Sequence, residues 1–201
     1  MTSTAPPPHP SICVYCGSRH GGLEAYTAAA RALGEAIGRR GWQLVYGGGQ
    51  VGLMGEVADA TLAAGGKVVG IITEALMQRE VGHRGLTELH VVQTMHDRKR
   101  MMAERADIFI ALPGGIGTME ELFEVWTWHQ LGYHDQPIGL LNVQGYYDGF
   151  LQFCRQMVGQ GFLAEQQLAV LNTHHEPESL LLDLHARWLE RSAGRDDYSK
   201  I

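Results

Sequence analysis

Residues 107–128 contain the stretch DIFIALPGGIGTMEELFEVWTW, and this stretch decides the fold class. It begins with a short apolar run, passes through a bend that holds three glycines, and then takes on the composition of a helix. A strand that enters a helix through a glycine-rich bend is the repeating unit of α/β proteins with parallel sheets. We therefore expect a strand at 107–112 and a helix at 117–131.

The same alternation extends along the whole chain. Further apolar runs predict strands at 11–16, 42–46, 67–72, 88–93 and 137–142. Because these runs are apolar on both alternating faces, the strands should be covered on both sides. Helices are expected at 23–40, 52–64, 94–105, 146–160 and 177–191. The pattern predicts a single α/β domain over 11–192, with a doubly wound parallel sheet, between a disordered lead-in at 1–10 and a tail at 193–201.

Composition limits the partners of this chain of 201 residues. The formal net charge is −6 and there is no long basic run, so nucleic acid is not an expected partner. No apolar stretch approaches the roughly 20 residues that span a bilayer, so no membrane association is expected. The three cysteines are an odd number, which argues against a disulfide framework and favours the cytoplasm.

Cys13 and Cys16 form a C-x-x-C pattern, which could indicate a redox or zinc site. However, they lie in an expected strand, where positions three apart point to opposite faces. We therefore expect both to be buried strand residues. The densest histidine cluster, HHEPE at 174–178, lies far along the chain from the glycine-rich segments. We expect a solvated turn there and no metal site.

Glycine-rich segments follow three of the expected strands, at 16–22, 46–55 and 113–118. Parallel strands present their carboxyl ends at one edge of the sheet, where ligands bind. Glycine allows backbone amides to approach an anion at a helix N-terminus, although each loop taken singly could be no more than a tight turn. The segment GGGQVG differs from the dinucleotide fingerprint, and the P-loop motif is absent from the sequence. The loops suggest a nucleotide phosphate and leave its identity open.

The segment TMHDRKRMM at 94–102 adds positive charge to this edge. Thr94 can cap the helix, with Asp97 three residues later. Arg98 and Lys99 then fall near the helix N-terminus, where the helix dipole disfavours cations. They are either a solvated helix end or the partners of an anionic ligand, with Arg98 holding phosphate or ribose oxygens.

Glu121 also has two possible roles. Thr118-x-x-Glu121 has the spacing of a capping box, in which the glutamate only closes the helix N-terminus. Alternatively, an ionised carboxylate there could stabilise an oxocarbenium-like sugar or activate water. The apolar residues of the helix at 117–131 are spread around more than one face, which predicts burial against the sheet and against a second subunit, and hence a homodimer.

The motif PGGIGTMEE at 113–121 resembles the PGG-x-GT-x-x-E signature of the Lonely Guy family of cytokinin riboside 5′-monophosphate phosphoribohydrolases. The resemblance extends from CVYCGS at 13–18 to the segment ending at 162, through LVYGGGQVGLMG, MHDRK and TWHQLGYHDQPIGLLN. It implies a dimeric, Rossmann-like enzyme without a cofactor. Such an enzyme hydrolyses the N-glycosidic bond of an N6-substituted AMP to free base and ribose 5-phosphate.

The resemblance also implies roles for individual residues. Arg98 and Glu121 would form the catalytic pair. The nucleotide site would be lined by Glu80, Lys99, Gly114, Gly115, Ile116, Gly117, Thr118 and Thr127, with Ser18, Gly47, Gly48 and Gly49 nearby. One departure is Thr73, which stands at a strand exit where the family has a proline.

Three other functions remain to be weighed against this one. Many relatives carry the label lysine decarboxylase, but nothing marks a lysine as a Schiff-base partner for pyridoxal phosphate. A general nucleosidase acting on AMP itself is the alternative within the enzyme class. A nucleotide-sensing module without chemistry is the alternative outside it, although anion binding alone does not require the carboxylate of Glu121.

Overall fold

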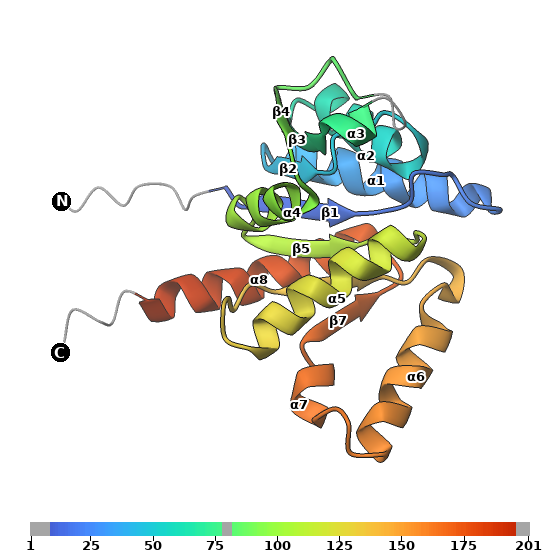
Figure 1. The fold of residues 1–201 in the computed structure, drawn as a ribbon, viewed down its shortest axis with the longest axis vertical. Coiled ribbons are helices and arrows are strands. Elements are labelled where there is room, and N and C mark those ends of the chain that lie inside the picture. The colour runs from blue at the N-terminus through green and yellow to red at the C-terminus, as the bar shows by residue number, and fades with distance from the viewer. Residues whose placement is uncertain (1–8, 78–81, 196–201) are drawn as a thin grey trace.

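The computed structural model describes residues 9–77 and 82–195 and confirms the doubly wound α/β fold (Figure 1). A parallel sheet runs in the order β4-β3-β2-β1-β5-β6-β7. Its strands are β1 (Ser11–Tyr15), β2 (Gln43–Tyr46), β3 (Lys67–Thr73), β4 (Glu88–Val92), β5 (Ile108–Ala111), β6 (Ile138–Leu141) and β7 (Leu171–His174). The chain moves outward from β1 to β4 and then returns to β5 beside β1, so the switch point of the sheet lies between β1 and β5.

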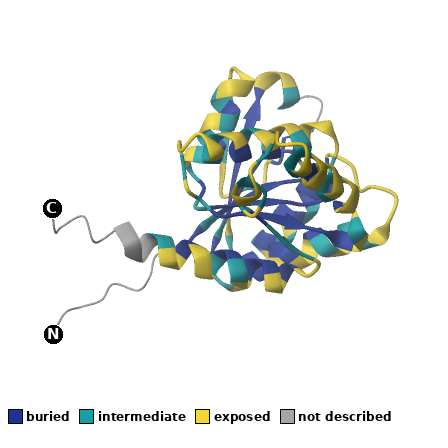
Figure 2. Ribbon diagram, turned by 90° about the horizontal axis from the view of Figure 1, so that it is seen from below, coloured by how far each residue is buried: buried dark blue, intermediate teal, exposed yellow. Residues whose placement is uncertain are grey.

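Helices cover both faces of the sheet, as expected. The helical elements are α1 (Glu24–Arg39), α2 (Gly52–Ala63), α3 (Glu74–Met77), α4 (Met95–Glu104), α5 (Ile116–Gln130), η1 (Val143–Gly145), α6 (Asp148–Gly159), α7 (Glu165–Leu168) and α8 (Pro177–Arg195). One core cluster lies between the sheet and helices α1, α2 and α8. The other lies between the sheet and helices α4, α5 and α6. Figure 2 shows the resulting layers, with buried strands inside and exposed outer helix surfaces.

The two cysteines of the C-x-x-C pattern are buried on opposite sides of the sheet. Cys13 belongs to the cluster beneath α4 and α5, whereas Cys16 belongs to the cluster beneath α1 and α2. This arrangement confirms the expectation from strand geometry, and the two thiols do not converge on a ligand.

Several elements differ from the sequence expectations. Strand β7 and the short helices α3 and α7 were not expected, and α8 runs to Arg195, beyond the expected end of the domain. Strand β4 lies at the edge of the sheet, where Val91 is 47% exposed, so it is not covered on both sides. Pro10, placed in the lead-in, is buried and accepts a hydrogen bond from the Gln43 amide.

The HHEPE segment is also more ordered than a solvated turn. His174 ends β7 and contacts Asp183 of α8 at 3.2 Å, and His175 Nδ1 lies 2.8 Å from the Asn142 carbonyl.

Among the described residues, no group of three or more histidine, cysteine or carboxylate side chains could hold a metal ion. Nor does any helix within the described ranges have the length and apolarity to cross a membrane.

Thr73, the departure from the family pattern, has a clear local role. It ends β3, and its side-chain oxygen accepts a hydrogen bond from the Leu76 amide at 3.3 Å. A hydroxyl in this position satisfies a backbone donor of the short helix α3, as an N-cap does. The strand exit therefore forms without the proline.

Candidate active site at the switch point

A pocket of about 600 Å³ opens where the loops after β1 and β5 meet. This is the position at which doubly wound sheets bind their ligands. Its lining residues come mainly from these two loops and from the adjoining helices. They are Cys16, Gly17, Ser18, Arg19, His20, Gly21, Tyr26, Leu53, Met54, Arg98, Pro113, Gly114, Gly115, Ile116, Gly117, Thr118, Glu121 and Tyr146.

Close backbone contact holds the two loops together. The Gly17 amide donates to the Pro113 carbonyl at 3.1 Å. At Gly114, a Cβ atom would lie 2.0 Å from Thr118 Oγ1 and 2.9 Å from the Gly17 nitrogen. A side chain at position 114 would therefore push the loops apart, which explains the glycine.

Two helix N-termini at this pocket lack the groups that usually neutralise them. Helix α5 begins after Gly115 and α2 after Val51, and neither has a side-chain cap or an acidic residue in its first turn. Within residues 9–77 and 82–195, the amides of Ile116, Gly117 and Thr118 have no hydrogen-bond acceptor. Unpaired amides and the positive end of the helix dipole together favour an anion.

Arg98 is buried on the inner side of this pocket. Its guanidinium donates to the Ile71 carbonyl at 3.0 Å, the Gly47 carbonyl at 3.2 Å and Glu121 Oε1 at 3.2 Å. A Cβ atom at Gly47 would lie 2.1 Å from Arg98 Nη2, so the glycine leaves room for the guanidinium. The alternative of a solvated helix end is therefore wrong for Arg98. Its side chain is 7% exposed and held in one position.

The structure also rules out the capping-box role of Glu121. The N-cap of α5 is Gly115, and Thr118 lies inside the helix, so Thr118 and Glu121 cannot cap it. Glu121 lies beyond the first turn, lines the pocket and has a side chain that is 11% exposed. The true cap in this region is Thr94, whose hydroxyl accepts from the Asp97 amide at 3.1 Å as expected.

Lys99 is not among the residues that line the pocket. Its ammonium group contacts Glu120 at 2.6 Å and Glu124 at 3.0 Å, both on α5. Desolvation alone would lower the pKa of Lys99, but the hydrogen bonds and charges of the two glutamates outweigh it and raise the pKa above its ordinary value. This lysine therefore ties α4 to α5 and stays protonated.

The other expected site residues fall into three groups. Ser18, Gly114, Gly115, Ile116, Gly117 and Thr118 line the pocket. Gly47, Gly48 and Gly49 lie behind Arg98, where the Gly48 carbonyl accepts from the His83 amide at 3.0 Å. Thr127 is exposed on α5 away from the pocket lining, and Glu80 lies outside the described residues.

Sequence reasoning missed several side chains that line the pocket, including Arg19, His20, Tyr26 and Tyr146. The Tyr146 hydroxyl donates to the Gly114 carbonyl, and its ring meets the Tyr26 ring edge-on at 5.7 Å. For Arg19 and His20, the available signal was the loop CGSRHGG at 16–22, which carries these two side chains among its glycines.

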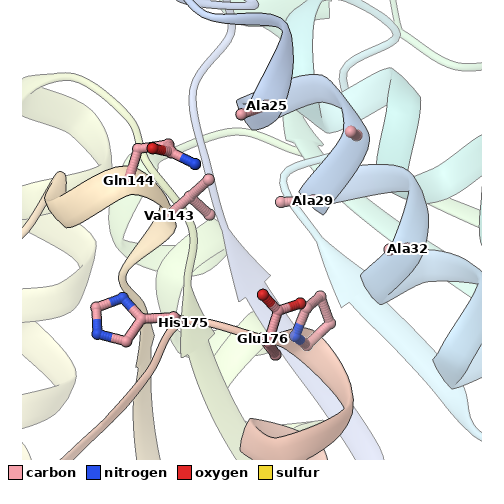
Figure 3. Close-up of a pocket in the computed structure, with 9 residues that line it drawn as sticks. Ala25, Ala29, Ala32, Val143, Gln144, His175 and Glu176 are labelled. Carbon is pink, nitrogen blue, oxygen red and sulfur yellow. The ribbon is translucent and has the colours of Figure 1, made fainter.

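A second hollow, of about 500 Å³, lies between α1, η1 and the turn before α8 (Figure 3). Four alanines of α1 form one wall, opposite Gln144, His175 and Glu176. Among the described residues, neither an arginine nor a lysine lines this hollow, and Glu176 adds a negative charge. The hollow is therefore poorly suited to an anion, in contrast to the pocket at the switch point.

Fold and site define a Rossmann-like α/β protein with a pocket between the loops after β1 and β5. The family model described as "Possible lysine decarboxylase" matches residues 54–184. The chain is 50% identical over 173 residues to cytokinin riboside 5′-monophosphate phosphoribohydrolase LOG of Oryza sativa subsp. japonica, covering 86% of this chain and 72% of that protein. It is also 50% identical over 153 residues to LOG1 of Arabidopsis thaliana, covering 76% and 72%. The chain belongs to this LOG family, as the PGGIGTMEE motif indicated.

Solved structures confirm the fold at lower sequence identity. The molybdenum cofactor binding protein of Rippkaea orientalis superimposes with a TM-score of 0.66 at 20% identity, over 90% of this chain and 98% of that one. The molybdenum cofactor carrier protein of Chlamydomonas reinhardtii gives the same TM-score and identity, over 89% and 99%. At this identity the likeness concerns the fold alone.

Proposed function

We propose that this protein hydrolyses the N-glycosidic bond of N6-substituted adenosine 5′-monophosphates, releasing the free base and ribose 5-phosphate. The observation that carries the proposal is the Arg98–Glu121 pair beside an anion pocket. A site built for anion binding alone would be better without a carboxylate in its lining. The relatives named above are phosphoribohydrolases of cytokinin riboside 5′-monophosphates, which supports the same substrate class.

Hydrolysis of this bond requires that the positive charge developing on the ribose be stabilised. The bond between C1′ and the base nitrogen breaks with its electrons moving to the base, and positive charge develops on the ribose. The oxygen of a water molecule forms the new bond to C1′, and one proton of that water ends on the departing base. The Glu121 carboxylate would stabilise the developing charge or accept the proton of the attacking water.

Arg98 positions this carboxylate. Because Arg98 is itself fixed by the Ile71 and Gly47 carbonyls, its contact with Glu121 sets where the carboxylate lies. An adjacent positive charge also favours the ionised form of a carboxylate. The free amides of α5 would hold the 5′-phosphate, so that the ribose is oriented between the phosphate and Glu121.

A decarboxylase that uses pyridoxal phosphate is not supported by the lysine in this region. A lysine that forms a Schiff base needs an accessible amine that loses its proton readily. Lys99 instead has a raised pKa and is held by two glutamates. The family model's description therefore does not match the chemistry of this region.

A panel of nucleotides tests the proposal and ranks the alternatives. The protein is incubated with N6-isopentenyladenosine 5′-monophosphate, AMP and GMP, and free base is measured by chromatography. We expect the N6-substituted nucleotide to have the highest kcat/KM. Equal kcat/KM for AMP would favour a general nucleosidase. Binding of these nucleotides without release of base would favour a sensing module.

We also infer a homodimer. Leu122, Val125 and Trp126 of α5 pack against the sheet, but Phe123 is 39% exposed on the same helix. Phe153 of α6 is 54% exposed, and Phe150 links α6 to Phe123 with ring centroids 5.6 Å apart. Apolar surface of this kind marks interaction sites. Sedimentation at micromolar concentration should give a dimer, and a monomer alone would refute this part of the proposal.

The cytoplasm remains the expected location. Cys13, Cys16 and Cys154 are all buried thiols. Desolvation raises the pKa of Cys154, as expected for a thiol that packs in a core and does not react. Fractionation of the host cell would test this expectation directly.

A further inference from the structure

Among the residues that the structure describes, the lining of the pocket at the switch point includes one cation, Arg19, whose side chain has no partner in the protein. Arg98 is held by Glu121 and two carbonyls, and Lys99 is held by two glutamates outside the pocket lining. His20 contacts Thr27 at 3.3 Å. Arg19 also lines the pocket and is exposed, and within residues 9–77 and 82–195 its side chain makes neither an ion pair nor a hydrogen bond.

The backbone that carries Arg19 is held by close packing. Gly52, at the start of α2, has a φ angle of +61°, and a Cβ atom there would lie 2.3 Å from the Arg19 nitrogen. The next anchor is the hydrogen bond from the Gly17 amide to the Pro113 carbonyl. The loop after β1 is thus packed against both α2 and the loop after β5, which keeps Arg19 in the lining of the pocket.

Charge matching indicates which ligand group Arg19 would meet. The pocket lining holds two arginines and one glutamate, and Glu121 is already paired with Arg98. Among the described lining residues, Arg19 is therefore the positive charge without a paired carboxylate, in a protein whose net charge is −6. It lines the same pocket as the unpaired amides of α5. A guanidinium and a helix N-terminus that share one pocket are suited to a phosphate dianion, which can accept from both.

We propose that Arg19 binds the 5′-phosphate of the substrate and thereby sets the preference for nucleotides over nucleosides. This inference rests on the proposed function and assigns the phosphate contact to the loop after β1. It replaces the sequence expectation that Arg98 and Lys99 hold the phosphate. Arg98 positions Glu121 instead, and Lys99 joins two helices.

The test compares Arg19→Gln with Lys67→Gln, a control that also removes one positive charge. Lys67 is exposed at the amino end of β3, at the edge of the sheet opposite the pocket. Affinities for AMP and for adenosine are measured by calorimetry, and kcat/KM is measured for both. Because Arg19 is exposed, the thermal midpoints of both variants should match wild type within about 2 °C.

We expect Arg19→Gln to weaken AMP binding and to lower kcat/KM for AMP by about 10- to 100-fold, the usual effect of one lost charge-assisted hydrogen bond. Adenosine values should be unchanged, and Lys67→Gln should match wild type for both ligands. Arg19→Lys keeps the charge and should recover part of the loss.

Equal AMP affinity in Arg19→Gln and Lys67→Gln would overturn the assignment, as would an equal loss for adenosine. If the wild-type protein binds AMP but cleaves neither AMP nor N6-isopentenyladenosine 5′-monophosphate, the proposed function fails. In that case the AMP affinities of the wild type and of Arg19→Gln still decide the role of Arg19. Failure of the proposed function is therefore distinguishable from failure of the Arg19 assignment.

Discussion

Replacement of Glu121 by glutamine separates a chemical role from a structural one. Glu121 and Arg98 are 3.2 Å apart and nearly buried, with side chains 11% and 7% exposed. The amide still accepts a hydrogen bond, and Arg98 keeps its two carbonyl partners, so the loss is limited to the charge of the acceptor. We expect a stability loss of about 1.5–3 kcal/mol, the range for hydrogen bonds to charged groups. At about 2–4 °C per kcal/mol for chains of this size, the thermal midpoint should fall by about 3–12 °C.

The turnover number should fall far more, by about 10²-fold or more, because the carboxylate is lost as a base and as a counter-charge. The assay measures free base released from a saturating nucleotide, with thermal melting in parallel. Glu120→Gln is the matched control, since Glu120 is adjacent, 51% exposed, and leaves Lys99 paired with Glu124. It should change neither quantity appreciably. A large stability loss with undiminished turnover in Glu121→Gln would refute the chemical role.

Two further predictions follow from the same contacts. Gly47→Ala should lower the turnover number by about 10-fold or more, because a Cβ atom at this position would lie 2.1 Å from Arg98 Nη2. Gly22→Ala is the control and should have no effect, because a Cβ atom at Gly22 would meet no atom within 4 Å. Equal activities of the two variants would contradict the role of Gly47. Desolvation lowers the pKa of His134, so the folded state favours the neutral ring and stability should be lost as the pH falls through about 6.5. Melting curves from about pH 7.5 to 5.5 should show this loss of stability, and His134→Asn should reduce the slope of stability against pH. An unchanged slope in the variant would contradict the role of His134.

Much of the fold followed from the sequence because buried strands carry a strong local signal. The runs at 107–112 and 137–142 are apolar except at one end, where Asp107 and Asn142 stand, and they match β5 and β6 to within one residue. Strand β7 was missed because LNTH contains a single aliphatic residue, and only Leu171 in it is fully buried. Its pairing with β6 depends on tertiary contact, which local pattern does not report.

The site was less predictable than the fold for a related reason. The glycine loops and the pair of Arg98 with Glu121 lie where the motif suggested. Which way a charged side chain turns depends on contacts far apart in sequence, as Lys99 shows by pairing with α5. The role of Glu121 depended on which residue is the N-cap of α5. Because α5 begins after Gly115, Glu121 lies too far along the helix to take part in a capping box.

Identifying both products tests the central claim most directly. The protein is incubated with N6-isopentenyladenosine 5′-monophosphate, and the mixture is analysed by liquid chromatography and mass spectrometry. Our account predicts free N6-isopentenyladenine and ribose 5-phosphate in equal amounts, with the phosphate still on the sugar. Release of nucleoside and inorganic phosphate, or recovery of intact nucleotide, would contradict it.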